Sequence, residues 1–209
     1  MVPRAGLAPS VVIVAVLVGC AEAPISGEGI MPPTSSATST TDESTSAPPS
    51  PASASPPSPE SAPLPGMSRY VSPTYGWSID YPNGWLVDSS NPTFVEIRDK
   101  DDSAMVGIHA VGTTIPLTDV VDEMLAFEEQ YHQEKGKTWV LVSRQPMSLP
   151  DGTPAIDVVV ELGPGGRSRQ LYVVSGDKAF AVDAETYTTL WDTFSEDFDR
   201  IVNSFTAPH

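Results

Sequence analysis

Apolar and polar side chains alternate in three segments between residues 77 and 110, which is the period of a β-strand with one buried face. The segment 77–81 ends at the turn-forming run Pro82-Asn83-Gly84. The segments 95–98 and 106–110 flank the polar run Asp99-Lys100-Asp101-Asp102. Because a short turn joins strands that run in opposite directions, this part of the sequence predicts one strand followed by an antiparallel hairpin.

The spacing of apolar residues becomes helical between Pro116 and Gly136. We expect a helix there, with Thr118 as its N-cap, Asp119 in its first turn and Gly136 at its end. One apolar stripe recurs every three or four residues: Val120, Met124, Phe127 and Tyr131, with Val121 and Leu125 beside it. We interpret the acidic residues of the other face as a solvated surface: Asp122, Glu123, Glu128, Glu129 and Glu134.

Four more strands and a second helix are predicted after residue 137. The strands cover about 138–145, 154–162, 168–175 and 178–185, and short runs rich in Gly, Pro and Asp separate them. The pattern predicts an α+β fold in which helices pack on an antiparallel β-sheet. The final helix is expected on the spacing of Leu190, Trp191, Phe194, Phe198, Ile201, Val202 and Phe205.

The first twenty residues have the pattern of an export signal. Arg4 precedes an apolar run over 11–18, which is shorter than the roughly 20 residues of a membrane-spanning helix and fits a secretory signal. The run ends in Leu-Val-Gly-Cys at 17–20, which resembles the lipobox of bacterial lipoproteins. The resemblance implies that residues 1–19 are a signal peptide and that Cys20 is lipidated, with a diacylglyceryl group and acyl chains such as palmitate. An ordinary signal peptide with an incidental cysteine is the alternative.

Residues 21–66 differ in composition from the rest of the chain. They contain eleven Pro, eleven Ser, five Thr and seven Ala, and no aromatic residue, Lys or Arg. Such a segment buries too little apolar surface to offset the entropy lost on ordering it. We therefore expect residues 20–66 to form a disordered stalk between a lipid anchor and a domain.

Residues 67–209 have the composition of one globular domain. They hold all four Trp, all six Tyr and all six Phe, and their 10 basic and 22 acidic residues give a formal charge of −12. A domain of this length buries roughly 70 % of its unfolded surface, which is enough for one core. The acidity excludes a basic nucleic-acid-binding surface, and the single cysteine excludes an intrachain disulfide framework.

The two ends of this domain carry its most distinctive motifs. Residues 75–85 read Tyr-Gly-Trp-Ser-Ile-Asp-Tyr-Pro-Asn-Gly-Trp, and residues 201–205 read Ile-Val-Asn-Ser-Phe. They resemble the opening and closing motifs of PsbP-like domains. The resemblance covers roughly residues 70–209, and the middle matches by its order of helix and strands. It implies an antiparallel sheet sandwiched by helices, a fold shared with a Ran-binding nuclear import factor.

The resemblance implies architecture rather than activity. Plant members of the family are extrinsic subunits of the oxygen-evolving complex of photosystem II, and many bacterial members are envelope lipoproteins. We do not carry photosystem docking over, because that role is tied to a basic docking surface and this domain has a formal charge of −12. The motif residues are expected to build a core and a turn: Trp77, Tyr81, Trp85 and Phe205 in the core, Pro82 and Gly84 in the turn.

Candidate catalytic and metal-binding residues are few. The sequence has no G-x-S-x-G, H-E-x-x-H or P-loop motif. His109 is expected to be partly buried in a strand, and His132 to be solvated on the first helix; neither has a second His at ligand spacing. We expect no catalytic residue and no cofactor.

One predicted turn concentrates carboxylates. Asp99, Asp101 and Asp102 lie within five residues of one another, and oxygen ligands of this kind suit Ca²⁺. The turn lacks the central Gly and the final Glu of an EF-hand loop, and Lys100 offsets part of its charge. We interpret it as a hydrated surface turn, with these three aspartates as the candidates for a metal site should one exist.

Two classes of function remain. The first is a non-catalytic binding or accessory module on the extracytoplasmic face of the cell membrane, which engages an envelope protein or a small ligand and no nucleic acid. The alternative is an envelope hydrolase whose site is assembled from dispersed residues. The lack of a nucleophile–base motif favours the first. A deep pocket of convergent polar groups with perturbed pKa values would favour the enzyme, and an exposed apolar patch would favour the binder.

Overall fold

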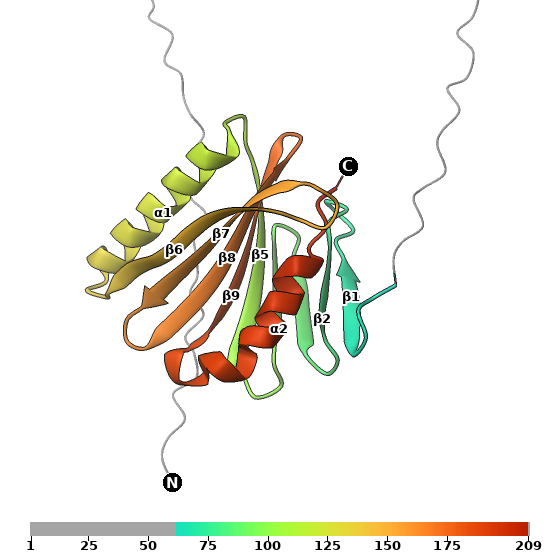
Figure 1. Ribbon diagram of the computed structural model, residues 1–209, viewed down its shortest axis with the longest axis horizontal. Coiled ribbons are helices and arrows are strands. Elements are labelled where there is room, and N and C mark those ends of the chain that lie inside the picture. The colour runs from blue at the N-terminus through green and yellow to red at the C-terminus, as the bar shows by residue number, and fades with distance from the viewer. Residues whose placement is uncertain (1–61, 209) are drawn as a thin grey trace, which may run out of the picture. The chain divides into compact units, whose positions relative to one another are not determined.

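The computed structural model describes residues 62–208, which form nine β-strands, two α-helices and one short 3-10 helix (Figure 1). The predicted signal peptide 1–19, Cys20 and most of the predicted stalk lie outside the described residues. In chain order the elements are β1 (Met67–Val71), β2 (Ser78–Pro82), β3 (Leu86–Asn91), β4 (Phe94–Arg98), β5 (Ala104–Gly112), α1 (Leu117–Glu134), β6 (Trp139–Ser148), β7 (Pro154–Leu162), β8 (Gly166–Ser175), β9 (Lys178–Tyr187), η1 (Thr188–Leu190) and α2 (Trp191–Ser204).

Seven of these strands form one antiparallel sheet, in the order β3-β4-β5-β9-β8-β7-β6. Strands β1 and β2 pair separately as an antiparallel hairpin. Each strand of the large sheet pairs in antiparallel fashion with its neighbours. Short turns join all of these neighbours except β5 and β9. The predicted α+β class with an antiparallel sheet is confirmed.

The structure adds two strands that the sequence pattern did not predict, β1 and β3. Strand β3 lies at one edge of the large sheet, and five of its six residues are exposed. A strand without a buried face has no alternation of apolar and polar residues, so its sequence, Leu-Val-Asp-Ser-Ser-Asn, gives no signal.

The expected N-cap of the first helix is wrong. Helix α1 begins at Leu117, and Pro116 holds the N-cap position without a side-chain capping bond. The Thr118 hydroxyl lies 3.2 Å from the carboxylate of Asp119 instead. Pro116 has φ −59°, which its ring already favours, so the proline initiates the helix in place of a capping hydroxyl.

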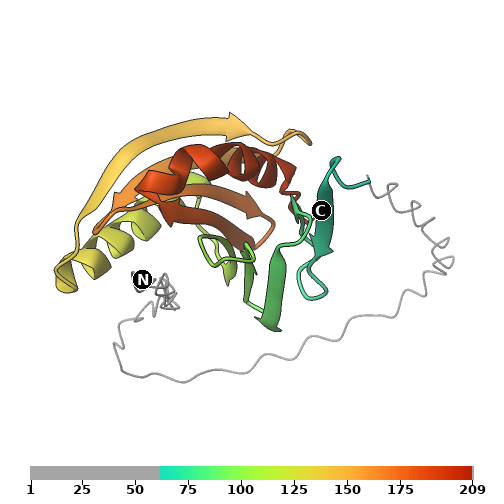
Figure 2. The same ribbon diagram turned by 90° about the horizontal axis from the view of Figure 1, so that it is seen from below.

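The two helices cover opposite faces of the large sheet (Figure 2). Successive side chains of a strand point to opposite faces. In β7, Ala155 belongs to the apolar cluster of α2, and the next residue, Ile156, belongs to the cluster of α1. Strand β7, and likewise β8 with Leu171 and Tyr172, therefore contributes to two separate cores.

The motif residues of the two ends of the domain meet in the α2 core, as predicted. Trp77 and Phe205 are each 1 % exposed, and their ring centroids lie 6.1 Å apart. Tyr81 and Trp85 are partly buried against the same cluster. The C-terminal residues lie beside the β1–β2 hairpin in both ribbon views (Figures 1 and 2).

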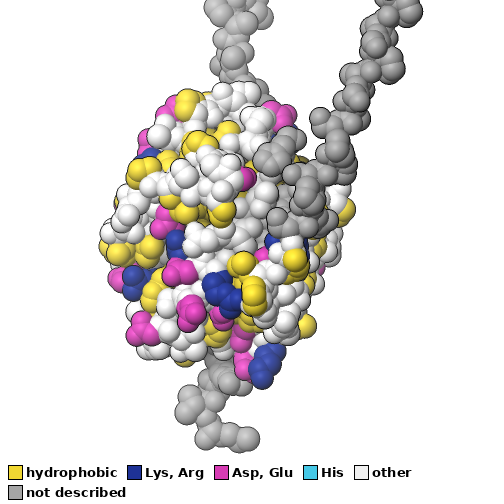
Figure 3. Space-filling model, turned by 45° about the vertical axis from the view of Figure 1, so that its right-hand side comes forward, with side chains coloured by type: hydrophobic (Ala, Val, Ile, Leu, Met, Phe, Trp, Pro, Cys, Tyr) yellow, Lys and Arg dark blue, Asp and Glu magenta, His cyan; other side chains and the backbone are white. Residues whose placement is uncertain are grey.

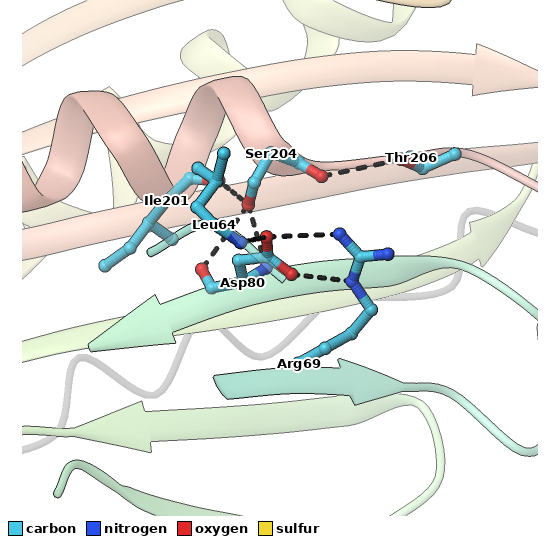
Figure 4. A network of polar contacts seen from close by, with 6 residues as sticks. All are labelled: Leu64, Arg69, Asp80, Ile201, Ser204 and Thr206. Carbon is cyan, nitrogen blue, oxygen red and sulfur yellow. Dashed lines mark hydrogen bonds and ion pairs between the residues drawn. The ribbon is translucent and has the colours of Figure 1, made fainter. Parts of the chain in front are cut away.

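Asp80, which is fully buried, ties the hairpin to α2 (Figure 4). Its carboxylate accepts hydrogen bonds from Arg69 Nε at 2.6 Å and Nη2 at 3.1 Å, and from the backbone N–H of Leu64 at 2.9 Å. The N–H of Asp80 donates to Ser204 Oγ at 2.8 Å, and that hydroxyl donates to the carbonyl of Ile201 at 2.7 Å. A buried carboxylate is tolerated only with such partners, so these contacts fix the hairpin against the helix.

Candidate functional site

The stripe of α1 that faces the sheet is apolar in its first half and polar in its second. Val121 and Leu125 are buried and pack in a cluster with Val158, Val160 and other residues of the sheet. The spacing of three or four residues then continues the same stripe to Glu128 and His132, which are also buried. The polar half of this stripe is where the candidate site begins.

Two of the sequence-based expectations for this helix are wrong. Glu128 and His132 were expected in solvent, and each is only 7 % exposed. The predicted apolar stripe is rotated relative to the real one, because Phe127 and Tyr131 are partly exposed and stack with centroids 6.4 Å apart. The sheet opposite Glu128 carries polar side chains, which make burial of the carboxyl group possible.

Glu128 is held by three side chains of the sheet. Gln170 Nε2 lies 3.0 Å from both carboxylate oxygens, and Trp139 Nε1 donates to Oε2 at 3.3 Å. The Tyr172 hydroxyl lies 3.4 Å from Oε1 and donates to Gln170 Oε1 at 2.9 Å. Strands β6 and β8 supply all three side chains. These contacts orient one carboxyl group in an otherwise packed interface.

Strand β9 places two more carboxylates on the same face of the sheet. Asp183 accepts a hydrogen bond from the Ser168 hydroxyl, and Glu185, two residues further on, is 5 % exposed. Both line one cavity of about 20 Å³, which is room for roughly one water molecule. Its full lining is Phe127, Glu128, Tyr131, His132, Leu162, Gln170, Asp183 and Glu185. We call this cavity the carboxylate pocket.

The pKa values of two acids in the carboxylate pocket are raised. Burial raises the pKa of Glu128 to about 7, with the nearby Asp183 carboxylate acting in the same direction and the hydrogen bonds to Glu128 opposing it. Burial also raises the pKa of Asp183 to about 6, against the hydrogen bond from Ser168. Burial and the two carboxylates raise the pKa of the Tyr172 hydroxyl well above its usual value. The pocket therefore takes up and releases protons near neutral pH.

The pKa values of the two internal histidines are lowered. Burial lowers the pKa of His132, with Lys137 contributing, and no hydrogen-bond partner contacts its Nδ1 in the described part of the chain. Burial lowers the pKa of His109 to about 4. His109 was expected to be partly buried in a strand, and it lies in β5 stacked on Phe94 with ring centroids 4.4 Å apart.

The aspartate-rich turn between β4 and β5 is a structural turn. Asp99 is buried rather than hydrated, which corrects the expectation for this residue. Its carboxylate accepts hydrogen bonds from the backbone N–H groups of Asp101 at 3.2 Å, Ser103, and Ala104 at 2.9 Å. Asp102 is exposed, lies 3.4 Å from Arg98 and has φ 56°. Within residues 62–208, no three His, Cys, Asp or Glu side chains are placed to hold one metal ion.

A second feature of the surface is the exposed edge strand β6. Val140, Leu141 and Val142 are 46 %, 43 % and 47 % exposed, and they are consecutive. Within residues 62–208, strand β6 pairs with β7 alone. Edge strands of globular domains rarely expose three consecutive aliphatic side chains to solvent.

Charges elsewhere on the surface are mixed. On the face drawn in Figure 3, Lys and Arg side chains are few and lie among acidic ones. Arg169, for example, contacts both Asp157 at 2.7 Å and Asp199. No helix within residues 62–208 has the length and the apolar character needed to cross a membrane.

The sequence contained a signal for the carboxylate pocket that the strand prediction did not use. In β9, Phe180, Val182 and Ala184 alternate with Ala181, Asp183 and Glu185. In β8, Gln170 and Ser168 likewise alternate with apolar Leu171 and half-buried Arg169. Two strands whose polar sides carry carboxylates, an amide and a hydroxyl predict a polar interface once a helix covers that face.

The comparisons with known proteins concern structure. No family model matches the sequence, and no curated protein matches it. The chain is similar to cyanobacterial PsbP from Synechocystis, with a TM-score of 0.57 and 19 % identity over 72 % of this chain and 98 % of that one. It is also similar to the Ran-binding protein Mog1p of Saccharomyces cerevisiae, with a TM-score of 0.48 and 11 % identity over 68 % of this chain and 95 % of that one.

A third similar structure is a Pseudomonas aeruginosa protein of unknown function. Its TM-score is 0.46 and its identity 14 %, over 68 % of this chain and 97 % of that one. At these identities the likeness shows the fold alone. The described domain has the PsbP-like fold that its opening and closing motifs implied.

Proposed function

We propose that this chain is a membrane-anchored extracytoplasmic lipoprotein whose PsbP-like domain is a non-catalytic binding or accessory module. The anchor rests on the lipobox resemblance at residues 17–20, where the one cysteine of the chain stands at the acylated position. The Pro- and Ser-rich segment that follows has the composition of a flexible spacer. Together they would tether the domain to a membrane and leave it free to reach a partner.

The binding role rests on one observation, the exposed aliphatic run of Val140, Leu141 and Val142 on a strand at the edge of the described sheet. Apolar surface exposed in this way is typical of contact sites for other proteins. The carboxylate pocket has a different character, since about 20 Å³ admits one water but no substrate. The surface of this domain therefore favours association over chemistry inside a cavity.

The second candidate is an envelope hydrolase, and the specific observation in its favour is Glu128. A buried carboxyl group with a pKa of about 7 has the acidity of a general acid or base at neutral pH. The exchange Glu128→Gln separates the two functions. It would abolish hydrolysis if Glu128 were catalytic. If the domain is a binder, we expect partner binding to be unchanged, because Gln keeps an oxygen that can accept from Trp139 at the start of β6.

The anchor is tested by the exchange Cys20→Ser. We expect the wild-type protein to incorporate labelled palmitate and to fractionate with membranes, and the variant to incorporate none and to accumulate as soluble protein or unprocessed precursor. A Cys20→Ser variant that still sediments with membranes at the mature size would refute the anchor.

The binding role is tested by photo-crosslinking in cells. A photoreactive amino acid is placed, one at a time, at the exposed apolar positions Val71, Leu86 and Leu141, which are 45 %, 65 % and 43 % exposed. We expect at least one position to give a discrete adduct of defined mass. Failure at all three, together with turnover of ester or glycoside substrates that Glu128→Gln abolishes, would favour the hydrolase.

A further inference from the structure

The two edges of the large sheet are built differently. Strand β3 has six residues, a register shift between Asp88 and Asn91, and an exposed polar run that ends it. Strand β6 has ten residues and carries its exposed aliphatic run at its start. Proteins blunt their edge strands with charges, prolines, bulges or short length, and β3 has several of these features.

Within β6, the protective charge and the proline lie in the second half. Arg144 carries a charge and bonds to Asp122 of α1, and Pro146 lacks a backbone N–H. The register shift against β7 falls between Leu141 and Ser143, at the last residue of the first half. The first half, residues 139–142, has no charge and no proline. This half of the edge is therefore the part of β6 better suited to pair with a further strand.

The side chains of the first half lie on both faces of the sheet. Val140 is in register with Glu161, which is exposed, and Leu141 is in register with Val160, which is buried beneath α1. A strand added beside β6 would therefore contact an aliphatic side chain above and below its own plane. Backbone hydrogen bonds would supply affinity, and these side chains would supply selectivity.

We propose that the first half of β6 accepts an extended segment of a partner protein as an eighth strand of the sheet, with aliphatic side chains and at least one Lys or Arg. The aliphatic requirement follows from Val140, Leu141 and Val142. The basic requirement follows from charge, because residues 67–209 carry a formal charge of −12 and Glu161 is exposed in register with Val140. A second copy fits less well, since it would bring another −12 to the same edge. This inference rests on the proposed binding function and names its site.

The test uses the full chain carrying Cys20→Ser and three synthetic octapeptides. The first alternates Val with Lys and Thr, the second has Glu in place of Lys, and the third repeats the first with N-methylated backbone amides on one edge. Affinity is measured by titration, and amide hydrogen exchange reports which backbone groups become protected. We expect the first peptide alone to bind measurably and to slow exchange within residues 138–142.

Two matched variants locate the site. Leu141→Ser should weaken the first peptide about tenfold, the loss expected when one apolar contact of about 1.4 kcal/mol is removed. Leu86→Ser makes the same exchange on the other edge and should leave affinity unchanged. Equal affinity in both variants, protection outside β6, equal binding of the acidic peptide, or a dimer that Leu141→Ser dissociates would each overturn the proposal.

Cross-linking separates failure of this site from failure of the proposed function. Adducts at Leu141 but not at Leu86 or Val71 support both the binding function and β6 as its site. Adducts only at Leu86 or Val71 keep the binding function and refute β6 as its site. Adducts at none of the three positions refute both.

Discussion

The two faces of the large sheet bury different chemistry although the same strands build them. On the face of α2, the buried helix residues are Phe198, Ile201 and Val202, all apolar. On the face of α1, the buried stripe changes after Leu125 to Glu128 and His132. The α2 core is therefore expected to contribute stability that is independent of pH, and the α1 interface to contribute stability that depends on it.

The difference begins within single strands. In β9, Val182 and Ala184 belong to the α2 core, while Asp183 between them and Glu185 after them line the carboxylate pocket. Burying two carboxylates on a strand costs stability unless hydrogen bonds or protonation compensate. Asp183 and Glu185 are therefore positions where apolar residues would avoid that cost.

The largest expected effect breaks the α2 core. Phe205→Ala removes a ring that lies 5.9 Å from Phe180 and 6.1 Å from Trp77, and it should lower the free energy of unfolding by about 3–5 kcal/mol. Trp77→Ala should cost the same range. Urea denaturation at pH 5 and at pH 8 should give equal losses, because no titrating group is removed. Losses below about 1 kcal/mol would mean that the motif aromatics do not form the core.

The next effect tests the polar link on the α2 face. Asp80→Asn keeps the shape of the side chain and removes the charge that faces the half-buried guanidinium of Arg69. Removing one partner of a buried ion pair costs about 3 kcal/mol or more. Ser204→Ala, which removes only the hydroxyl that accepts from the Asp80 N–H, should cost about 1 kcal/mol. An Asp80→Asn variant no less stable than Ser204→Ala would show that the ion pair is dispensable.

The sequence predicted the α2 face better than the α1 face, for a physical reason. An apolar core leaves a periodic pattern, and Trp77, Ile79 and Phe205 follow it. Glu128 of α1 is buried because Gln170 of β8 and Trp139 of β6 donate hydrogen bonds to its carboxylate. A local pattern does not contain such long-range partners, so an acid on a helix is assigned to solvent. Asp99 was assigned to solvent for a different reason: its partners are backbone N–H groups of its own turn, and an apolar–polar pattern does not report backbone hydrogen bonds.

A third prediction tests the α1 interface through pH. The pKa of Glu128 is about 7 in the folded protein, against a usual value of 4.5. The folded state therefore binds the proton more tightly than the unfolded state, and stability is full below about pH 4.5 and is lost as pH rises through 7. Glu128→Gln removes this loss and should stabilise the protein at pH 8 by on the order of 2–3 kcal/mol. At pH 5 the difference should shrink to within about 1 kcal/mol.

Other titrating groups at the carboxylate pocket also contribute to the pH dependence of stability, so a control variant is needed. Asp183, with a pKa of about 6, also makes the folded protein less stable as pH rises, and the Glu128→Gln variant retains this effect. His132 has the opposite effect: because burial lowers its pKa, the folded protein loses stability as pH falls. Glu129→Gln changes an exposed neighbour on the same helix and should leave the pH profile unaltered. If Glu128→Gln and Glu129→Gln give the same profile, Glu128 does not couple folding to protons.

The smallest expected effect concerns calcium at the turn between β4 and β5. A true Ca²⁺ site, at a metal concentration of 100 times its dissociation constant, would stabilise the protein by about 2.7 kcal/mol. Asp99 already directs its oxygens at backbone N–H groups, and Asp102 lies beside Arg98. Few of the six to eight oxygen ligands that Ca²⁺ needs are therefore left at this turn. We expect calcium to raise the melting temperature no more than magnesium at equal ionic strength, both in the wild-type protein and in Asp101→Asn. A saturable rise specific to calcium that Asp101→Asn abolishes would make this turn a metal site and would show that the Asp99 carboxylate exchanges its backbone partners for an ion.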